Sequence, residues 1–450
     1  MVWTSNNFKY DMVNLPRESN YKVCIECFAY NQKEYIKDML EGILMQKTDF
    51  PFYALVIDDA STDGTREIIE EYCRRYPDRF SALLAYENIF GKKESYDIYR
   101  DTLFTYTNNS VYVATCEGDD YWIDKEKLWI QVEYMDNHPD CMMYLHNSHL
   151  VDCRTGEIKS ADPFECEEEK DLEMSELILI KNGHPATASR LYRQEMIFAP
   201  KYVTDCSVGD YPMMLYCASQ GCVHYSDRIM CDYRFISKGS TTEIMQADIG
   251  YRLYHRLGVL IFLLQFDEQT EYKYHEYISE ASNPYAEDII GMAGNGNKID
   301  EYWRTNKGKY SLINEYKWVN FFDKYRRQLF DEDYLHEDAL NQILKFEKII
   351  IMGTGFYSQI LRKKLKGAGC KINGFARTVV DNDEDRYEGY PLWQLDRIPY
   401  ERDEFLLLIG IRPKRDDRIF KSLRENEIKH YLNPFDISEL YMNRRNICHE

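Results

Sequence analysis

Three carboxylates within four residues follow a short apolar segment in the first third of this sequence. The apolar segment covers residues 111–115, and the carboxylates are Glu117, Asp119 and Asp120. An apolar run rich in β-branched residues predicts a buried strand, so the turn after it presents these side chains together at a sheet edge. Crowded carboxylates raise each other's pKa, and a divalent cation removes that repulsion while helping to hold a diphosphate. The alternative is a solvated acidic loop without a ligand.

A second acidic turn occurs about sixty residues earlier. The apolar residues 53–57 predict another strand, which ends at Asp58 and Asp59. Residues 61–63 are Ser, Thr and Asp, which are good helix N-caps, and the periodic apolar positions of residues 68–76 predict an amphipathic helix. Either Asp58 or Asp59 could serve only to cap that helix, because the first helical turn favours negative charge. The recurrence of the pattern on neighbouring strands favours a functional role for at least one of the two.

The elements that position both turns form an alternating series. The expected strands are residues 23–28, 53–57, 81–86 and 111–115, and the expected helices are residues 35–44, 68–76 and 96–105. Strands that alternate with helices predict an α/β fold with a mostly parallel sheet. Ligands of such sheets gather at the carboxyl ends of the strands, where both acidic turns lie. The two turns are therefore expected to contact one ligand.

Residues 20–245 resemble a family 2 glycosyltransferase with the GT-A nucleotide-diphospho-sugar transferase fold. The resemblance rests on five short motifs in a characteristic order: residues 28–31, 56–65, 117–122, 209–212 and 233–234. Each motif alone is a weak signal, but their order and spacing together are specific.

The resemblance implies roles for four donor-binding residues. Asp59 would accept a hydrogen bond from the base of a nucleoside diphosphate sugar, and Tyr30 would lie beside that base. Asp119 would face the ribose. Arg234 is expected to add positive charge near the phosphates, with packing against a tyrosine neighbour as the equally weighted alternative.

The resemblance also implies a metal site and a catalytic base. Asp120, with Glu117, would ligate Mn²⁺ or Mg²⁺ bridging the two phosphates, and Asp210 would remove the proton from the acceptor hydroxyl. Glu117 stands where relatives commonly have Asp, and Ile236 stands where many have a metal-contacting histidine, so the ligands other than Asp120 stay open. A Gln-x-x-Arg-Trp signature of processive synthases is not visible, which favours transfer of a single sugar. His184, beside a proline, is interpreted as a loop residue rather than an acceptor contact.

Composition bounds the partners and the compartment. A net charge of −20 over 450 residues argues against a nucleic-acid surface and gives a second reason to expect a cation beside an anionic donor. Thirteen scattered cysteines, including Cys24 and Cys27 on opposite faces of one expected strand, indicate buried free thiols in a reducing cytosol. Neither a secretory signal nor a membrane-spanning segment is expected, so the prediction is a cytoplasmic protein, with a peripheral encounter at the inner face of the membrane left open.

Two further regions follow the transferase domain, for which we expect residues 1–245. Residues 246–345 predict a helical connecting region, broken at residues 283–284 and 291–297. Residues 346–450 predict a Rossmann-like α/β domain, with a strand at 348–352 and a glycine-containing turn at 353–358. Ser358 replaces the third glycine of a dinucleotide fingerprint, and the usual acid about twenty residues further on is absent. A structural, dimerising or ligand-sensing role is therefore favoured over dinucleotide binding.

The sequence thus predicts an inverting, metal-dependent glycosyltransferase of surface polysaccharide or glycoconjugate synthesis. It would use a nucleoside diphosphate sugar, with uridine as the expected base, and a glycan, lipid-linked or protein acceptor. Two alternatives stay open: an NAD(P)-dependent oxidoreductase that uses the C-terminal domain, and a nucleotide-sugar-binding protein without turnover.

Overall fold

The computed structural model describes residues 2–5, 8–14, 21–88, 110–180, 182–293, 335, 337–378, 385–410 and 417–435. The chain divides into two compact units, Met1–Gly258 with Asn306–Leu312 and Val259–Thr305 with Ile313–Glu450. The expected domain boundaries at residues 245 and 345 stay a prediction. The expected helix at 96–105 lies outside the described residues.

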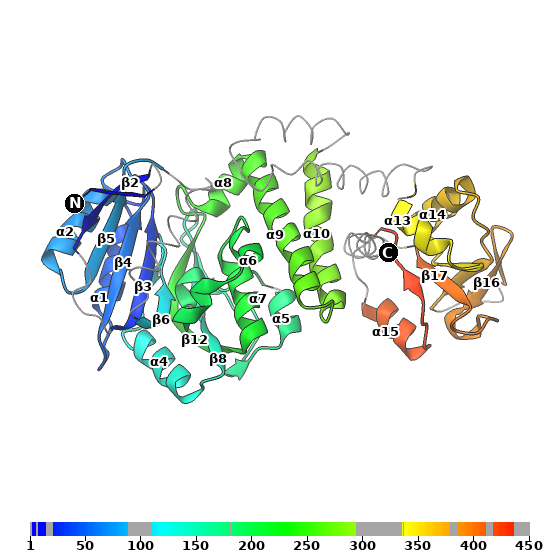
Figure 1. Ribbon diagram of the computed structural model, residues 1–450, viewed down its shortest axis with the longest axis horizontal. Helices are drawn as coiled ribbons and strands as arrows, with labels where there is room; N and C mark the ends of the chain where they lie inside the picture. Colours follow the sequence, from blue (N-terminus) through cyan, green and yellow to red (C-terminus); the bar gives the residue numbers. More distant parts are fainter. Residues whose placement is uncertain are drawn as a thin grey trace. The chain divides into compact units, whose positions relative to one another are not determined.

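A mixed sheet with a central run of parallel strands organises the first unit (Figure 1). Among the described residues its order is β1-β2-β5-β4-β3-β6-β11-β8-β12-β10, with β7 beside β12 and β9 beside β8. The strands are β1 (Val2–Ser5), β2 (Phe8–Val13), β3 (Tyr21–Ala29), β4 (Phe52–Asp58), β5 (Phe80–Ala85), β6 (Ser110–Thr115), β7 (Tyr121–Trp122), β8 (Cys141–Asp152), β9 (Ile158–Ser160), β10 (Lys170–Asp171), β11 (Leu191–Arg193) and β12 (Cys222–Phe235). Strands β5, β4, β3 and β6 run parallel, as the sequence predicted, so their carboxyl ends share one edge.

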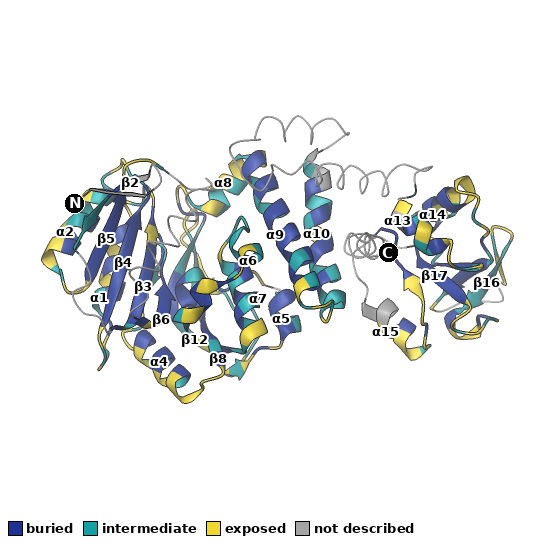
Figure 2. Cartoon of the chain, in the orientation of Figure 1, coloured by how far each residue is buried: buried dark blue, intermediate teal, exposed yellow. Residues whose placement is uncertain are grey.

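The helices of the first unit are α1 (Ile36–Leu44), α2 (Thr65–Arg75), α4 (Lys127–Asn137), α5 (Met174–Ile178), α6 (Lys201–Thr204), α7 (Asp210–Gln220), α8 (Thr241–Ala247) and the start of α9 (Ile249–Gln269). Helices α1 and α2 agree with the predicted helices at 35–44 and 68–76. Helices α1, α2 and α4 contribute Ile36, Ile69 and Leu128 to one core with Val23 and Ile25 of β3. Strands β3, β4, β5 and β6 are buried along most of their length (Figure 2). This packing fixes the sheet edge where the acidic turns emerge.

Strand β3 places its two cysteines on opposite faces of the sheet, as expected. Cys27 belongs to the core beneath the helices, whereas Cys24 packs with Tyr53 and Leu55 on the other face. Both thiols are buried and free. The predicted burial of both thiols is confirmed.

Glu26 is a carboxyl group buried in the middle of β3. Its side chain accepts a hydrogen bond of 3.1 Å from the Tyr192 hydroxyl through Oε2, while Oε1 has no hydrogen-bond partner in the described part of the chain. The residue is only 5% exposed. Burial raises the pKa of Glu26 to about 7, and the Tyr192 hydrogen bond opposes that rise only in part. The folded protein therefore favours the neutral acid.

Glu26→Gln is expected to stabilise the protein at pH 8 but not at pH 4.5. Because the folded pKa lies above the ordinary value of 4.5, the stability contributed by the neutral carboxyl is present below pH 4.5 and is lost as the pH rises through about 7. The amide mimics the neutral acid at every pH. The difference in unfolding free energy between the variant and the wild type should therefore be about 3 kcal/mol more favourable to the variant at pH 8 than at pH 4.5. Denaturant unfolding at both pH values measures this. The exposed Glu71→Gln is the control, and an equal difference at both pH values would contradict the prediction.

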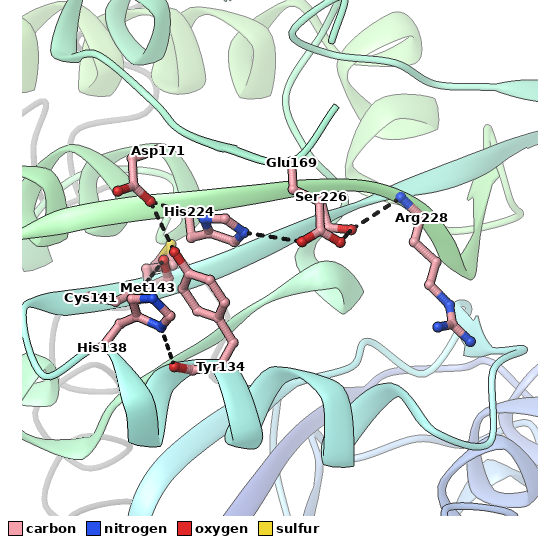
Figure 3. Close-up of polar contacts among 9 residues, drawn as sticks. All are labelled: Tyr134, His138, Cys141, Met143, Glu169, Asp171, His224, Ser226 and Arg228. Atoms are coloured by element: carbon pink, nitrogen blue, oxygen red, sulfur yellow. Dashed lines mark hydrogen bonds and ion pairs between the residues drawn. The ribbon is translucent and has the colours of Figure 1, made fainter. Parts of the chain in front are cut away.

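A polar cluster lies where β8 and β12 begin (Figure 3). The Tyr134 ring stacks between the imidazoles of His138 and His224, with centroid distances of 4.0 and 3.8 Å. His224 Nδ1 lies 2.9 Å from Asp171 Oδ1 on β10. These contacts join α4 and the edge strand β10 to the start of β12. We interpret the cluster as structural, because the acidic turn meets β12 at its other end.

The second unit contains a parallel sheet with the order β15-β16-β14-β13-β17-β18, in which only the β15–β16 pair is antiparallel. Its described elements are α10 (His275–Ala293), α13 (Glu337–Ile343), β13 (Lys348–Met352), α14 (Phe356–Gly367), β14 (Gly374–Arg377), β15 (Arg386–Tyr387), β16 (Tyr390–Gln394), β17 (Phe405–Ile409), α15 (Asp417–Glu425) and β18 (Tyr431–Leu432). Ser358 donates a 2.8 Å hydrogen bond to the Gly410 carbonyl, so it ties α14 to the end of β17. The Rossmann-like assignment stays a prediction.

One predicted break is wrong. Helix α10 continues through Pro284, which lies inside it, rather than stopping at residues 283–284. Proline removes one helical hydrogen bond, but packing on an apolar face can outweigh that loss. Ile278, Ala286 and Ile289 of this helix are fully buried. Across the described segments, none of the helices is both long enough and apolar enough to cross a membrane.

Candidate active site

Hydrogen bonds join the loops that follow β3 and β4 at the carboxyl edge of the sheet. The Asn31 N–H donates to Ser61 Oγ at 2.9 Å, and the Thr62 N–H donates back to Asn31 Oδ1 at 2.8 Å. The Gln32 N–H donates to Thr65 Oγ1 at 2.8 Å. Asn31 adopts a left-handed conformation with φ of 52°, which asparagine tolerates better than most residues. The two loops therefore form one connected surface.

This surface carries Tyr30 and Asp59, the two residues expected beside a nucleobase. The Tyr30 side chain is 45% exposed, so its ring can stack on a ligand. The Asp59 N–H donates to the Ala29 carbonyl at 2.9 Å, which places Asp59 next to the end of β3. The fold thus brings both residues to one edge, and their contacts with a base stay a prediction.

Asp58 has a structural position instead. Its side chain is fully buried, and Oδ2 accepts a hydrogen bond from the Ser61 N–H at 3.2 Å. Helix α2 begins after Gly64, and the Asp63 carboxylate accepts the Thr65 N–H at 3.0 Å. Asp58 therefore stabilises the turn, and Asp63 accepts a hydrogen bond at the start of α2.

The turn after β6 is anchored to β3 through its backbone. The Cys116 N–H donates to the Glu26 carbonyl at 3.0 Å, and the Gly118 N–H donates to the Phe28 carbonyl at 2.8 Å. A Cβ atom on Gly118 would come within 2.3 Å of Gln32 Oε1. A side chain at position 118 would displace the Gln32 amide, so the acidic turn packs directly against the loop after β3.

The two aspartates of this turn have different partners. Asp119 Oδ2 accepts a 2.6 Å hydrogen bond from the Ser237 hydroxyl, and Asp120 Oδ1 accepts one of 2.9 Å from the Arg234 N–H. Asp120 Oδ2 is buried and has no hydrogen-bond partner among the described residues. Burial, followed by repulsion from Asp119 and Glu117, raises the pKa of Asp120 well above its ordinary value. The site thus holds a buried carboxyl oxygen without a hydrogen-bond partner in the described part of the chain.

Arg234 supports the turn from the end of β12. Its guanidinium donates to the Asp119 carbonyl at 2.7 Å and pairs with Asp38 on α1. The same group lies over the rings of Tyr121 and Tyr35, at 4.3 and 5.0 Å from their centroids. These contacts are of the packing type that the sequence left open as the alternative, and a contact with phosphates stays a prediction.

The residues of the turn fit a divalent cation in part. No group of three or more His, Cys, Asp or Glu side chains in the described ranges is placed to hold a metal ion by itself. Mg²⁺ is commonly bound by one or two carboxylates together with substrate phosphates, so a complete protein cage is not required. The unpartnered Asp120 Oδ2 suits such a half-site. The role of Glu117 as a second ligand stays a prediction.

Asp210 stands at the first residue of α7 beside a buried arginine. Its Oδ2 lies 3.3 Å from a terminal nitrogen of Arg190, and its Oδ1 accepts the Tyr211 N–H at 2.9 Å. The Arg190 side chain is 5% exposed, and that of Asp210 is 31% exposed. Burial alone would raise the pKa of Asp210, but the charges of Arg190 and then His184 outweigh it and hold this pKa below its ordinary value.

Glu117 links Asp210 to the acidic turn. Its pKa rises to about 8 because of burial, then because of the negative charges of Asp119 and Asp210, while Arg190 opposes the rise. All these groups are thus within electrostatic reach of one another, as the strand order predicts. Sequence reasoning missed Arg190 and Ser237, since neither belongs to an acidic motif.

Part of the chain matches a known family. Residues 27–197 match the model described as Glycosyl transferase family 2. This segment includes both acidic turns and Arg190 but ends before Asp210.

Curated relatives match over shorter segments. The uncharacterized protein Rv1520 of Mycobacterium tuberculosis is 43% identical over 127 residues, which is 28% of this chain and 35% of that protein. The poly(ribitol-phosphate) beta-N-acetylglucosaminyltransferase TarS of Staphylococcus aureus is 30% identical over 113 residues, which is 24% of this chain and 18% of TarS. The chain therefore spans about a third of the first relative and less than a fifth of the second. A crystal structure of S. aureus TarS 1-349 in complex with UDP-GlcNAc aligns with 77% of this chain and 89% of its own at 17% identity, with a TM-score of 0.42.

Proposed function

We propose that this protein is a glycosyltransferase that moves one sugar from a nucleoside diphosphate sugar, with uridine as the base, to an acceptor hydroxyl. The observation that carries the proposal is the buried, unpartnered carboxylate oxygen of Asp120 within one electrostatic cluster with the ionised Asp210. The family 2 match over residues 27–197 supports the same reaction class.

The donor would bind along the edge formed by the three loops. Tyr30 stacks on the base and Asp59 accepts a hydrogen bond from it, while Asp119 faces the ribose. Asp120, with Glu117, would hold Mn²⁺ or Mg²⁺. Such a cation, when bound, stabilises the negative charge that develops on the leaving diphosphate.

Asp210 would act as the general base. Its carboxylate takes the proton of the acceptor hydroxyl, the acceptor oxygen forms a bond to the anomeric carbon, and the bond between that carbon and the diphosphate oxygen breaks with its electron pair. Attack from the face opposite the diphosphate inverts the anomeric configuration. Arg190 supports this role, because its charge lowers the pKa of Asp210 and so favours the ionised carboxylate.

The acceptor class is proposed by analogy with the named relative. TarS acts on poly(ribitol-phosphate), and we propose a surface polysaccharide or glycoconjugate acceptor here, glycosylated in the cytoplasm. The second unit would serve a structural, dimerising or ligand-sensing role.

A donor screen tests the proposal. We expect UDP-sugars, but not GDP- or dTDP-sugars, to raise the melting temperature in the presence of Mn²⁺, and EDTA to remove the effect. A ligand at one hundred times its dissociation constant adds about 2.7 kcal/mol to the unfolding free energy, which is readily measured. Stabilisation by NAD(P) alone would favour the oxidoreductase alternative. Donor binding without transfer or hydrolysis would favour the non-catalytic one.

A further inference from the structure

We propose that Arg190 is a positioning residue that holds the Asp210 carboxylate in the orientation needed to accept the acceptor proton. This inference rests on the proposed function. Arg190 itself does not touch the reacting atoms; it acts through Asp210.

The position of Arg190 is rigid. The residue caps the short helix Thr187–Ser189, and β11 begins immediately after it between β6 and β8. The Arg190 N–H donates to the Thr187 carbonyl at 3.3 Å. Its guanidinium is therefore delivered from the middle of the sheet rather than from a loose surface loop.

The burial of this guanidinium has a cost that its observed contacts offset only partly. Arg190 is 4% exposed, and its Nε has no hydrogen-bond partner in the described ranges. A buried charge is destabilising unless it is paired. The ion pair with Asp210 is a long one, at 3.3 Å. A buried and incompletely paired Arg190 is better suited to control the ionisation of Asp210 than to stabilise the fold.

Both oxygens of Asp210 are held, one by Arg190 and one by the Tyr211 N–H. These two contacts restrict the orientation of the carboxylate at the start of α7. Four other titratable groups interact electrostatically with Asp210: Glu117, His184, Cys206 and His255. A charged Glu117 opposes the ionisation of Asp210. Without Arg190, burial and this repulsion would both favour the protonated form of Asp210, which cannot act as a base.

The test compares Arg190→Met and Arg190→Lys with a matched control, Arg193→Met. Arg193 lies three residues further on, where its guanidinium donates to the carbonyls of Cys141 and Met135 at 2.9 and 3.0 Å. These contacts are structural and are made away from Asp210. Each variant is assayed for transfer between pH 5 and 9, for donor KM, and for melting temperature.

We expect Arg190→Met to lower kcat at pH 5.5 by up to about tenfold, with a smaller loss at pH 8, because one neighbouring opposite charge commonly shifts a carboxyl by one to three pH units. The acid limb of the profile should move to higher pH. Donor KM should change less than about twofold, and Arg190→Lys should recover part of the loss. Arg193→Met should lower the melting temperature and leave the pH profile unchanged. Equal profiles for Arg190→Met and Arg193→Met would overturn the proposal.

A measurement independent of turnover separates this inference from the proposed function. Carbon-13 NMR titration of labelled aspartate carboxyls, assigned with Asp210→Asn, reports the ionisation of Asp210 directly. A wild-type protein without transfer or hydrolysis would refute the proposed function, yet the titration should still move to higher pH in Arg190→Met. An unmoved titration would refute the role of Arg190 even in an active enzyme.

Discussion

Asp210→Asn should reduce the rate of sugar transfer by about a thousandfold while leaving donor binding nearly intact. The amide cannot take the acceptor proton, and general base catalysis contributes roughly a hundredfold to ten-thousandfold. Binding should persist, because Asp210 stands at the start of α7 and not on the loops that carry Tyr30 and Asp59. Single-turnover transfer assays and calorimetric titration with the donor measure the two quantities separately.

Asp205→Asn is the matched control for this experiment. Asp205 is a partly exposed carboxylate five residues earlier, paired with Lys201 on α6. Exposed pairs of this kind contribute little, so the control should keep its transfer rate and its stability within about 0.5 kcal/mol. Full activity in Asp210→Asn would remove Asp210 from the mechanism. Loss of donor binding would show instead that Asp210 belongs to the donor site.

Asp120→Asn should move stability and function in opposite directions. A neutral amide no longer attracts a cation, so Mn²⁺-dependent donor binding should be lost and transfer should fall by about a hundredfold or more, equivalent to several kcal/mol of lost charge stabilisation. Without metal or nucleotide, the same variant should unfold at higher denaturant concentration, because it removes the repulsion of a buried carboxyl group by Asp119 and Glu117. The expected gain is roughly 1 kcal/mol or more.

Glu26→Gln provides the comparison for Asp120→Asn. Both residues are buried carboxyls with one unpartnered oxygen, and both substitutions should stabilise the protein near pH 8. Only Asp120→Asn should abolish the effect of Mn²⁺ on donor binding, since Glu26 lies within β3 and not in the turn. If the two variants bind donor and metal alike, Asp120 has no special role in the site.

The parallel half of the sheet was predictable from local patterns. The four predicted strands differ from β3, β4, β5 and β6 by at most two residues at either end, because apolar β-branched runs between turns have few other stable arrangements. The strand order then placed both acidic turns at one edge. The repulsion among the carboxyl groups of the turn after β6 was predictable from their spacing, because three of them occur within four residues.

The other half of the site depended on contacts that spacing does not encode. Strand β11 has three residues and runs antiparallel between β6 and β8, so it carries too little periodicity to be recognised. Arg190 owes its position to that strand. Ser237 reaches Asp119 because Ile236 adopts φ of 56°, a conformation that is rare for β-branched residues and is set by tertiary structure.

The joined loops after β3 and β4 bear on how quickly a sugar nucleotide is captured. Their mutual hydrogen bonds hold each loop against the other, so the surface proposed to meet the base would have little conformational entropy to lose on binding. Encounter there is limited by diffusion and orientation rather than by a folding step. If these loops bind the nucleoside as proposed, selectivity for the base would depend on the fixed hydrogen bonds between them rather than on a rearrangement during binding.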